Sequence, residues 1–183
     1  MSLRVIAGSA RGRRLLAPRG AKTRPTADRV KENLFNILQP YTQGARFLDL
    51  FGGSGAIGIE ALSRGAREAV FVERDPDTAS VIRDNLKHTN LSESAVIMTM
   101  TAERAIRKLR ESVFDIIFMD PPYAGGLLSE TFTLLERTPL LNGEGFLAAE
   151  LPARAENPVS ETYEMFRTKI YGNVKLVLYT HAR

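Results

Sequence analysis

Cysteine and tryptophan are absent from this chain of 183 residues, and histidine occurs only twice. Without cysteine the chain forms no disulfide and no thiolate metal site, and such a composition is typical of cytosolic proteins. His88 and His181 are far apart in the sequence and fit no metal-ligand or catalytic-triad pattern. We therefore expect no metal site and a cytoplasmic location.

Long apolar runs and export signals are also lacking. No apolar segment approaches the roughly 20 residues that cross a bilayer, and the first residues show no charged segment followed by an apolar one. Hydrophobic residues make up 44% of the chain and charged residues 25%, as in an ordinary globular domain. This length suits one domain with a core of its own, and we expect a monomer without a membrane partner.

Acidic side chains are almost missing from the first 31 residues. This segment holds nine basic residues and one acid, for a net charge of +8, whereas the rest holds 16 basic and 20 acidic residues and carries −4. We expect residues 1–24 to form a basic arm and residues 25–183 to form the main domain. Such an arm indicates a polyanionic partner, because lysine and arginine displace counterions from phosphates. The alternative is a solvated basic terminus without a partner.

The arm contains two short apolar pieces, within residues 4–16, that are separated by Gly8, Ser9 and Gly12. This pattern predicts a small β-hairpin rather than a helix. Arginines on such a ribbon could follow a phosphate backbone. The residues expected to contact nucleic acid are Arg4, Arg11, Arg13, Arg14, Arg24 and Arg29.

A helix is expected after a loop that ends at Pro25, with Thr26 or Asp28 as its cap. Its apolar residues recur at helical spacing, at Val30, Leu34, Ile37 and Leu38. Pro40 and Gly44 are expected to end it. We expect this helix to pack across an edge of a sheet and to leave Arg29 and Lys31 exposed.

From residue 46 onward, apolar strands alternate with amphipathic helices. The strands are predicted at residues 46–51, 69–73, 95–100, 114–119 and 145–151, and the helices at residues 56–64, 76–87, 103–110 and 127–136. Repeated β-α-β units require a mostly parallel sheet with helices on both faces. Two further strands, at residues 162–170 and 174–180, are expected to pair as an antiparallel hairpin at one edge. The predicted fold class is α/β, a doubly wound, Rossmann-like sheet with an N-terminal hairpin arm.

The segment DLFGGSGAIG, which begins at Asp49, joins the first predicted strand to its helix. Gly53, Gly55 and Gly58 satisfy G-x-G-x-x-G in this context, which is typical of loops that bind nucleoside cofactors. An acid at Asp49 would repel a pyrophosphate and attract a cationic amino-acid group. Glu73 ends the second strand, where an acid accepts hydrogen bonds from ribose hydroxyls. The alternatives are a tight turn without a ligand and a surface ion pair for Glu73.

The segment MDPPY, residues 119–123, follows an apolar strand, so Asp120 lies at the strand's carboxyl end. Ligands of open α/β sheets bind outside that end. Two prolines fix φ and remove two N–H donors, which leaves a stiff turn with carbonyls free to accept hydrogen bonds. An acid, rigid acceptors and the ring of Tyr123 suit a planar substrate with an NH2 group. The alternative is an ordinary Pro-Pro turn.

These motifs resemble those of the seven-stranded S-adenosylmethionine-dependent methyltransferases, in which [DN]-PP-[YFW] marks enzymes that methylate exocyclic or amide NH2 nitrogens. The blocks RVIAGSARGRRL, RPTADRVKENLFNIL and LDLFGGSGAIGIEALSRGA further resemble the bacterial RsmD family, which methylates N2 of one guanine in 16S ribosomal RNA. The resemblance covers nearly the whole chain and is loosest over residues 152–183. It implies S-adenosylmethionine as cofactor and 16S ribosomal RNA as partner, either free or within the 30S subunit or an assembly intermediate.

The resemblance also implies a role for each motif residue. The methionine and ribose part of the cofactor would lie against Asp49, Gly52, Gly53 and Gly55, and the ribose hydroxyls would bind Glu73. Thr101 and Ala102 would lie against the adenine, where relatives often carry an acid before the alanine. The remaining residues of the expected cofactor set are Phe51, Ser54, Arg74 and Asp120.

The catalytic loop implied by the resemblance consists of Asp120, Pro121, Pro122 and Tyr123. Hydrogen bonds to the Asp120 carboxylate and the Pro121 carbonyl would orient the lone pair of the amine and stabilise its growing positive charge. Tyr123 would stack on a base that has been flipped out of its pair. Either Asp120 or water then takes the proton.

Three other functions remain open on the sequence alone. A DNA adenine-N6 methyltransferase fits DPPY equally well, but such an enzyme usually needs a target-recognition insertion. A nicotinamide-dependent oxidoreductase would use the glycine loop, but it leaves DPPY unexplained. A nucleic-acid-binding module with a degenerate enzyme fold would bind its ligands without turnover.

Overall fold

The computed structural model describes residues 3–18, 20, 25–122 and 126–183, with only the backbone at residues 25–28. Seven strands form one sheet in the order β3-β2-β1-β4-β5-β7-β6. Their bounds are β1 Arg46–Asp49, β2 Glu68–Glu73, β3 Ala95–Thr99, β4 Phe114–Met119, β5 Leu141–Pro152, β6 Tyr163–Tyr171 and β7 Val174–His181. The first five strands pair in parallel, whereas β7 pairs antiparallel with both β5 and β6. The predicted doubly wound sheet with a terminal hairpin is confirmed.

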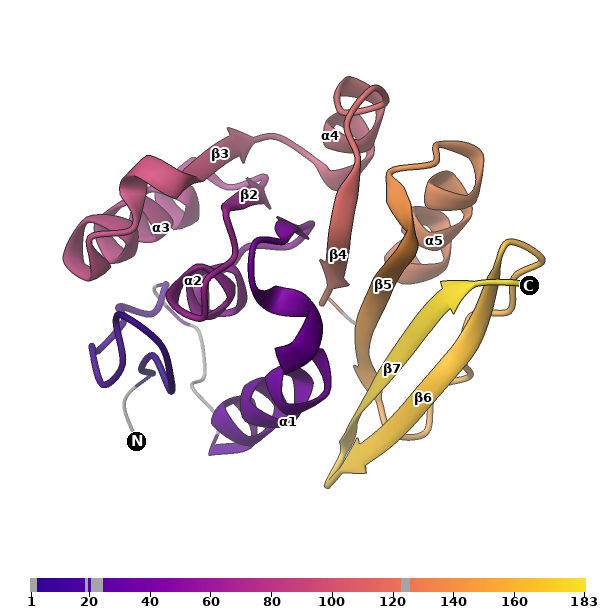
Figure 1. The fold of residues 1–183 in the computed structure, drawn as a ribbon, viewed down its shortest axis with the longest axis horizontal. Coiled ribbons are helices and arrows are strands. Elements are labelled where there is room, and N and C mark those ends of the chain that lie inside the picture. Colours follow the sequence, from indigo (N-terminus) through magenta and orange to yellow (C-terminus); the bar gives the residue numbers. More distant parts are fainter. Residues whose placement is uncertain (1–2, 19, 21–24, 123–125) are drawn as a thin grey trace.

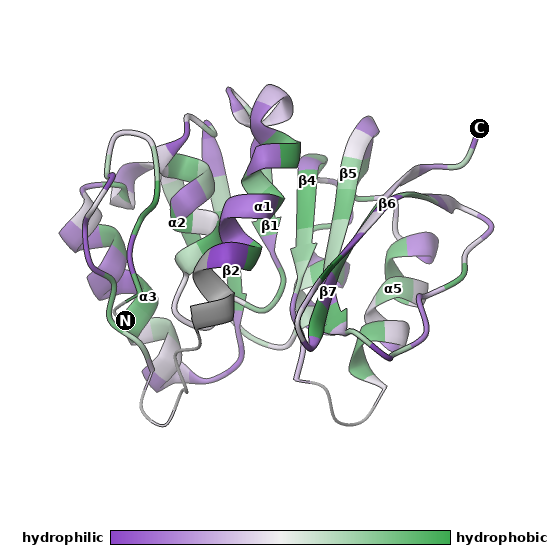
Figure 2. Ribbon diagram, turned by 90° about the horizontal axis from the view of Figure 1, so that it is seen from below, coloured by the Kyte–Doolittle hydropathy of each residue, from purple (hydrophilic) through white to green (hydrophobic). Residues whose placement is uncertain are grey.

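Helices cover both faces of the sheet. Figure 1 shows α1, α2 and α3 on one face and α4 and α5 on the other. Their bounds are α1 Pro25–Thr42, α2 Ala56–Ser63, α3 Pro76–Thr89, α4 Ala102–Lys108 and α5 Leu127–Arg137, with a short 3₁₀ turn at Ser92–Ser94. Alternate residues of each strand face opposite layers, so the chain has one apolar cluster on each face. In Figure 2 the apolar strands lie between helices whose outer faces are hydrophilic.

Two strand boundaries differ from the prediction. β1 ends at Asp49 rather than at residue 51, because the chain turns there into the glycine loop. β5 begins at Leu141 rather than at residue 145, because Leu141 already pairs with Phe114 of β4. It runs one residue past the predicted end, to Pro152, which pairs with Val174 of β7.

Helix α1 forms where a helix was predicted, but its end differs. It begins at Pro25 and continues through Pro40 to Thr42. A proline this close to the end costs a single backbone hydrogen bond, and the Thr42 hydroxyl adds a bond of 2.8 Å to the Leu38 carbonyl. The helix buries Leu34 and Leu38 in the cluster on one face of the sheet, and it also contacts the edge strand β6.

The N-terminal arm is a short hairpin, as predicted. Arg4 and Arg14 form an antiparallel bridge, and the arm lies beside α2 and α3 (Figure 1). Gly8 lies so close to α2 that an added Cβ would come within 1.7 Å of the Ser63 carbonyl oxygen, so a side chain here would displace the arm. Val5 is buried in the same cluster as α1 and α2.

Lys31 is buried, although the sequence predicted an exposed side chain. Its ammonium group lies 3.3 Å from the carboxylate of Glu60 on α2 and donates to the Arg4 carbonyl of the arm. A lysine is tolerated in such a position because it is paired with a carboxylate and hydrogen-bonded. Arg29, two residues before Lys31, is exposed as predicted.

Within the described residues, no helix is both long and apolar enough to cross a membrane.

Candidate active site

The glycine loop leaves β1 between the two neighbouring strands. Backbone hydrogen bonds join Leu50 N–H to the Phe118 carbonyl of β4 (3.0 Å) and Gly52 N–H to the Val72 carbonyl of β2 (2.8 Å). Gly53 has a φ of +53°, which is left-handed and suits glycine. The loop is therefore held in a fixed shape at the point where the strand order reverses, which is where open α/β sheets bind their ligands.

Glu73 shapes the same loop from the end of β2. One carboxylate oxygen accepts from Gly53 N–H at 3.0 Å and the other accepts from Asp75 N–H at 2.9 Å. A carboxylate has about four lone-pair sites. Glu73 can therefore hold the loop and still accept hydrogen bonds from two hydroxyl groups.

Asp49 lies beneath the loop and is buried. Burial raises its pKa to about 7, against the lowering effect of hydrogen bonds from the backbone of Phe51 and Gly58; the nearby Glu73 carboxylate raises it further. An acid that titrates near neutral pH is a ready acceptor for a cationic group that enters the pocket.

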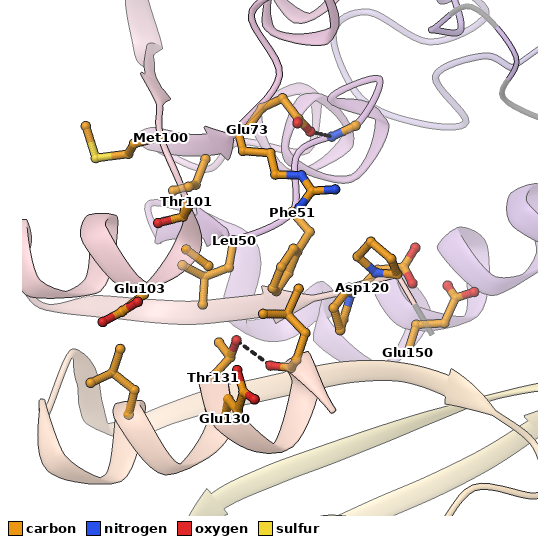
Figure 3. A pocket seen from close by; sticks show the side chains of 18 of the residues that line it. Leu50, Phe51, Glu73, Met100, Thr101, Glu103, Asp120, Glu130, Thr131 and Glu150 are labelled. Atoms are coloured by element: carbon orange, nitrogen blue, oxygen red, sulfur yellow. Dashed lines mark hydrogen bonds between the residues drawn. The ribbon is translucent and has the colours of Figure 1, made fainter. Parts of the chain in front are cut away.

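A pocket of about 1600 Å³ opens along this edge of the sheet. Figure 3 shows Glu73 and Thr101 toward one side, Asp120 and Glu150 together on the other, and the ring of Phe51 between them. Most of the expected cofactor residues line this pocket, namely Phe51, Gly53, Ser54, Glu73, Arg74, Thr101, Ala102 and Asp120. Gly52, Gly55 and Asp49 are buried behind it.

Thr101 is the N-cap of α4, Ala102 is the first residue of that helix, and both line the pocket. The Thr101 hydroxyl caps the helix by accepting from Arg104 N–H at 3.4 Å. The Ala102 side chain is nearly buried and lines the pocket beside Met100. Leu50, Met100 and Ala102 give the pocket apolar surface, and the Thr101 hydroxyl and the Glu103 carboxylate add polar groups to its lining.

The loop after β4 carries the expected catalytic residues. Asp120, Pro121 and Pro122 line the pocket, with Pro121 buried and Pro122 exposed. The Asp120 side chain is open to the pocket, yet protein surrounds it closely enough to raise its pKa well above the usual range; Glu150 and Asp49 raise the pKa further by charge repulsion. Tyr123 lies outside the described residues.

Glu150 is a pocket residue that the sequence interpretation missed. It stands on β5 next to Asp120, since the parallel pair Met119↔Ala149 precedes both residues. The signal was present in the sequence, because FLAAE at residues 146–150 is an apolar run ending in an acid. Each of the four neighbouring strands β2, β1, β4 and β5 thus has an acid near its carboxyl end. These acids are Glu73, Asp49, Asp120 and Glu150.

The arm forms one wall of the same pocket through Leu3, Ala17, Pro18 and Gly20. Asn85 of α3 joins this wall to the glycine loop. Its Oδ1 accepts from Leu16 N–H at 2.7 Å, while its Nδ2 donates to the carbonyls of Leu16 (3.0 Å) and Ser54 (2.8 Å). Asn85 is buried, and it joins the arm to the glycine loop within the protein interior.

The arginines expected to contact nucleic acid lie on and beside the arm. Arg4, Arg11, Arg14 and Arg29 are exposed. Arg13 is half-buried and donates to the His88 carbonyl of α3, so part of its role is to hold the arm. Arg24 lies outside the described residues.

Comparison with known proteins places the whole chain in one family. The family model described as Conserved hypothetical protein 95 matches residues 3–180. The Bacillus subtilis protein YlbH is 42% identical over 180 residues, which cover 97% of this chain and 98% of that protein. Ribosomal RNA small subunit methyltransferase D of Escherichia coli K12 is 37% identical over 178 residues, which cover 97% of this chain and 89% of the enzyme.

Solved structures share the fold over the same length. The structure of the Escherichia coli protein yhhF has a TM-score of 0.88 at 37% identity, covering 99% of this chain and 98% of its own. A more distant structure, SMU.776 complexed with SAH, has a TM-score of 0.67 at 16% identity. It covers 81% of this chain and 48% of its own, and at that identity it shows the fold alone.

Proposed function

Because the chain belongs to the RsmD family of ribosomal RNA methyltransferases, we propose that it transfers a methyl group from S-adenosylmethionine to the exocyclic N2 of a specific guanine in 16S ribosomal RNA. One observation carries the proposal. The glycine loop with Glu73 and the Asp120 loop line a single pocket, so a cofactor site and an amine-acceptor site adjoin.

The residues around the glycine loop fit S-adenosylmethionine. Glu73 has acceptor capacity left for the ribose hydroxyls, and the buried Asp49 favours a cation rather than a phosphate. Thr101 and Ala102 line the part of the pocket that would hold the adenine ring. A nicotinamide dinucleotide fits less well, because its pyrophosphate would lie at the glycine loop, next to the Asp49 carboxyl.

The exocyclic amine is a weak nucleophile, because its lone pair is delocalised into the ring. The enzyme must therefore orient and activate it. S-adenosylmethionine supplies an electrophilic methyl group carried on a sulfonium. The Asp120 carboxylate and the Pro121 carbonyl accept hydrogen bonds from the NH2 group and direct its lone pair into the pocket. The same acceptors stabilise the positive charge that grows on nitrogen. Pro121 and Pro122 keep this acceptor geometry rigid.

The substrate reaches the pocket past the arm. The exposed arginines Arg4, Arg11, Arg14 and Arg29 supply positive charge for the RNA backbone. We propose that residues 1–24 act as the RNA-binding arm of a monomeric cytoplasmic enzyme, and that residues 25–183 hold the chemistry. Arg24 and Tyr123 keep their proposed roles in phosphate binding and base stacking.

The test is a binding and transfer assay with the purified protein. Calorimetry with S-adenosylmethionine and with NAD separates the methyltransferase from the oxidoreductase. Incubation with methyl-labelled cofactor and 30S subunits, naked 16S RNA or DNA then identifies the substrate after digestion to nucleosides. We expect binding of S-adenosylmethionine and label in guanine of the RNA. Binding of NAD alone, or label in adenine of DNA, would contradict the proposal.

A further inference from the structure

Asp120 and Glu150 form a pair of acids at the substrate end of the pocket. They follow the paired residues Met119 and Ala149 on the parallel strands β4 and β5, so they stand at neighbouring positions. Figure 3 shows both carboxylates on the same side of the pocket. Glu150 is one of the charges that raise the pKa of Asp120, as expected of two carboxylates that face each other closely.

The cofactor acids lie on the other two strands. Glu73 on β2 and Asp49 on β1 are adjacent to the glycine loop, whereas Glu150 is separated from that loop by β4. Because β5 lies beyond β4 in the sheet, Glu150 is beside the position proposed for the substrate amine. We therefore expect Glu150 to contact the substrate base rather than the cofactor.

A guanine presents two kinds of donor on one edge, the NH2 group at N2 and the neighbouring N1–H. In the proposed mechanism, the Asp120 carboxylate and the Pro121 carbonyl accept the hydrogen bonds of the NH2 group. We propose that Glu150 accepts a hydrogen bond from guanine N1–H and is the residue that selects guanine among bases with an exocyclic amine. This inference rests on the proposed function and adds the determinant of base choice.

The other amine-bearing bases are rejected by the same residue. Adenine and cytosine carry a ring nitrogen next to the amine that is an acceptor without a proton. Such a base would place that acceptor against the Glu150 carboxylate, so two acceptor lone pairs would face each other where guanine makes a hydrogen bond. Sites built to hydrogen-bond a donor reject analogues that lack it by large factors.

The test uses an analogue that keeps the amine and lacks the N1 proton. 2-Aminopurine has the NH2 group at C2, an unprotonated N1 and no O6. An RNA substrate is prepared with guanine or 2-aminopurine at the methylated position, and kcat/KM is measured for each. We expect the wild-type enzyme to favour guanine by about 100-fold or more. A preference within about threefold would overturn the assignment.

Two variants separate the contribution of Glu150 to the guanine preference from the effect of the O6 atom that 2-aminopurine lacks. In Glu150→Gln the side-chain amide can donate to the bare N1 of 2-aminopurine, so we expect the guanine preference to fall at least about tenfold. In Glu150→Ala, turnover of the guanine RNA should fall toward that of the 2-aminopurine RNA, which should change little. The matched control is Glu144→Gln, an exposed glutamate at the far end of β5, which should keep the wild-type preference.

The outcomes distinguish this inference from the function on which it rests. Thermal melting and cofactor calorimetry first establish that each variant folds and binds S-adenosylmethionine. Methylation of guanine with an unchanged preference in both Glu150 variants overturns the role of Glu150 and leaves the proposed function standing. Methylation of neither RNA by the wild-type enzyme overturns both.

Discussion

Lys31 of α1 and Glu60 of α2 form an ion pair with 3.3 Å between Nζ and Oε2, and both side chains are buried. The same carboxylate accepts from the backbone N–H groups of Ile6 (2.8 Å) and Ala7 (3.0 Å) in the arm. It also binds Arg64 Nε at 2.8 Å. One buried acid thus joins the arm and two helices, and the N-terminal arm is an integral part of the fold.

Removing this acid should be costly. We expect Glu60→Ala to lower the free energy of unfolding by about 3–5 kcal/mol, because it removes a buried carboxylate that pairs with Lys31 and Arg64 and accepts from two N–H groups of the arm. Denaturant unfolding followed by circular dichroism measures the loss. The control is Glu103→Ala. Glu103 forms an exposed ion pair with Arg107, and its loss should lower the free energy of unfolding by less than about 0.5 kcal/mol. Equal losses in the two variants would contradict the role of Glu60.

The bonds of Asn85 predict that the arm and the cofactor loop are coupled. Asn85→Ala removes three buried hydrogen bonds, to Leu16 and Ser54, so both the arm and the loop should loosen. We expect the affinity for S-adenosylmethionine to fall about tenfold or more, measured by calorimetry. Asp84→Ala, an exposed neighbour on α3, should bind as the wild type does. An unchanged affinity in Asn85→Ala would mean that the loop holds its shape without the arm.

The buried carboxyl of Asp49 predicts a pH-dependent stability. Its pKa in the folded state is raised from 3.8 to about 7, chiefly by burial. Folding therefore favours the protonated form, and the stability from this group is fully present below about pH 4 and is lost as pH rises through about 7.

Asp49→Asn removes that dependence. Without cofactor, the difference in free energy of unfolding between the variant and the wild type should increase in favour of the variant by roughly 3–4 kcal/mol from pH 4 to pH 8. Urea unfolding of both proteins at the two pH values measures this change. A constant difference between the two proteins across this range would show that Asp49 does not titrate there.

The arm arginines predict the salt dependence of RNA binding. Changing Arg11, Arg13 and Arg14 together to Ala should weaken RNA binding and flatten the plot of log affinity against log salt concentration by about two to three units of slope. The control is a triple variant in which Arg104, Lys108 and Arg110 are changed to Ala; these residues lie on α4 and just after it, on the other face of the sheet. If both triples have the same slope, the arm is not the binding surface.

The sequence predicted the parts of the site that depend on local pattern. The strands and the glycine loop follow from alternation and turn residues, and Asp49, Glu73 and Asp120 follow from acids at strand ends. Glu150 carried the same signal, one residue before the predicted end of its strand at residue 151, and the sequence interpretation missed it.

The burial of Lys31 could not be predicted, because a lysine on an amphipathic helix indicates a solvated face unless its partner is known. That partner, Glu60, lies 29 positions away on another helix and becomes a neighbour only through tertiary packing. The same holds for Asn85, which meets the arm and the glycine loop from α3.

The central claim is that Asp120 promotes methylation of guanine N2. The most direct test is transfer of a labelled methyl group to 30S subunits from cells that lack the modification, with wild-type enzyme and with Asp120→Ala. We expect N2-methylguanosine in 16S RNA with the wild type and at least a 100-fold loss in Asp120→Ala, about the cost of removing a group that stabilises transition-state charge. S-adenosylmethionine affinity should change only about threefold or less. Full turnover by Asp120→Ala, or no label at guanine N2 with the wild type, would contradict the account.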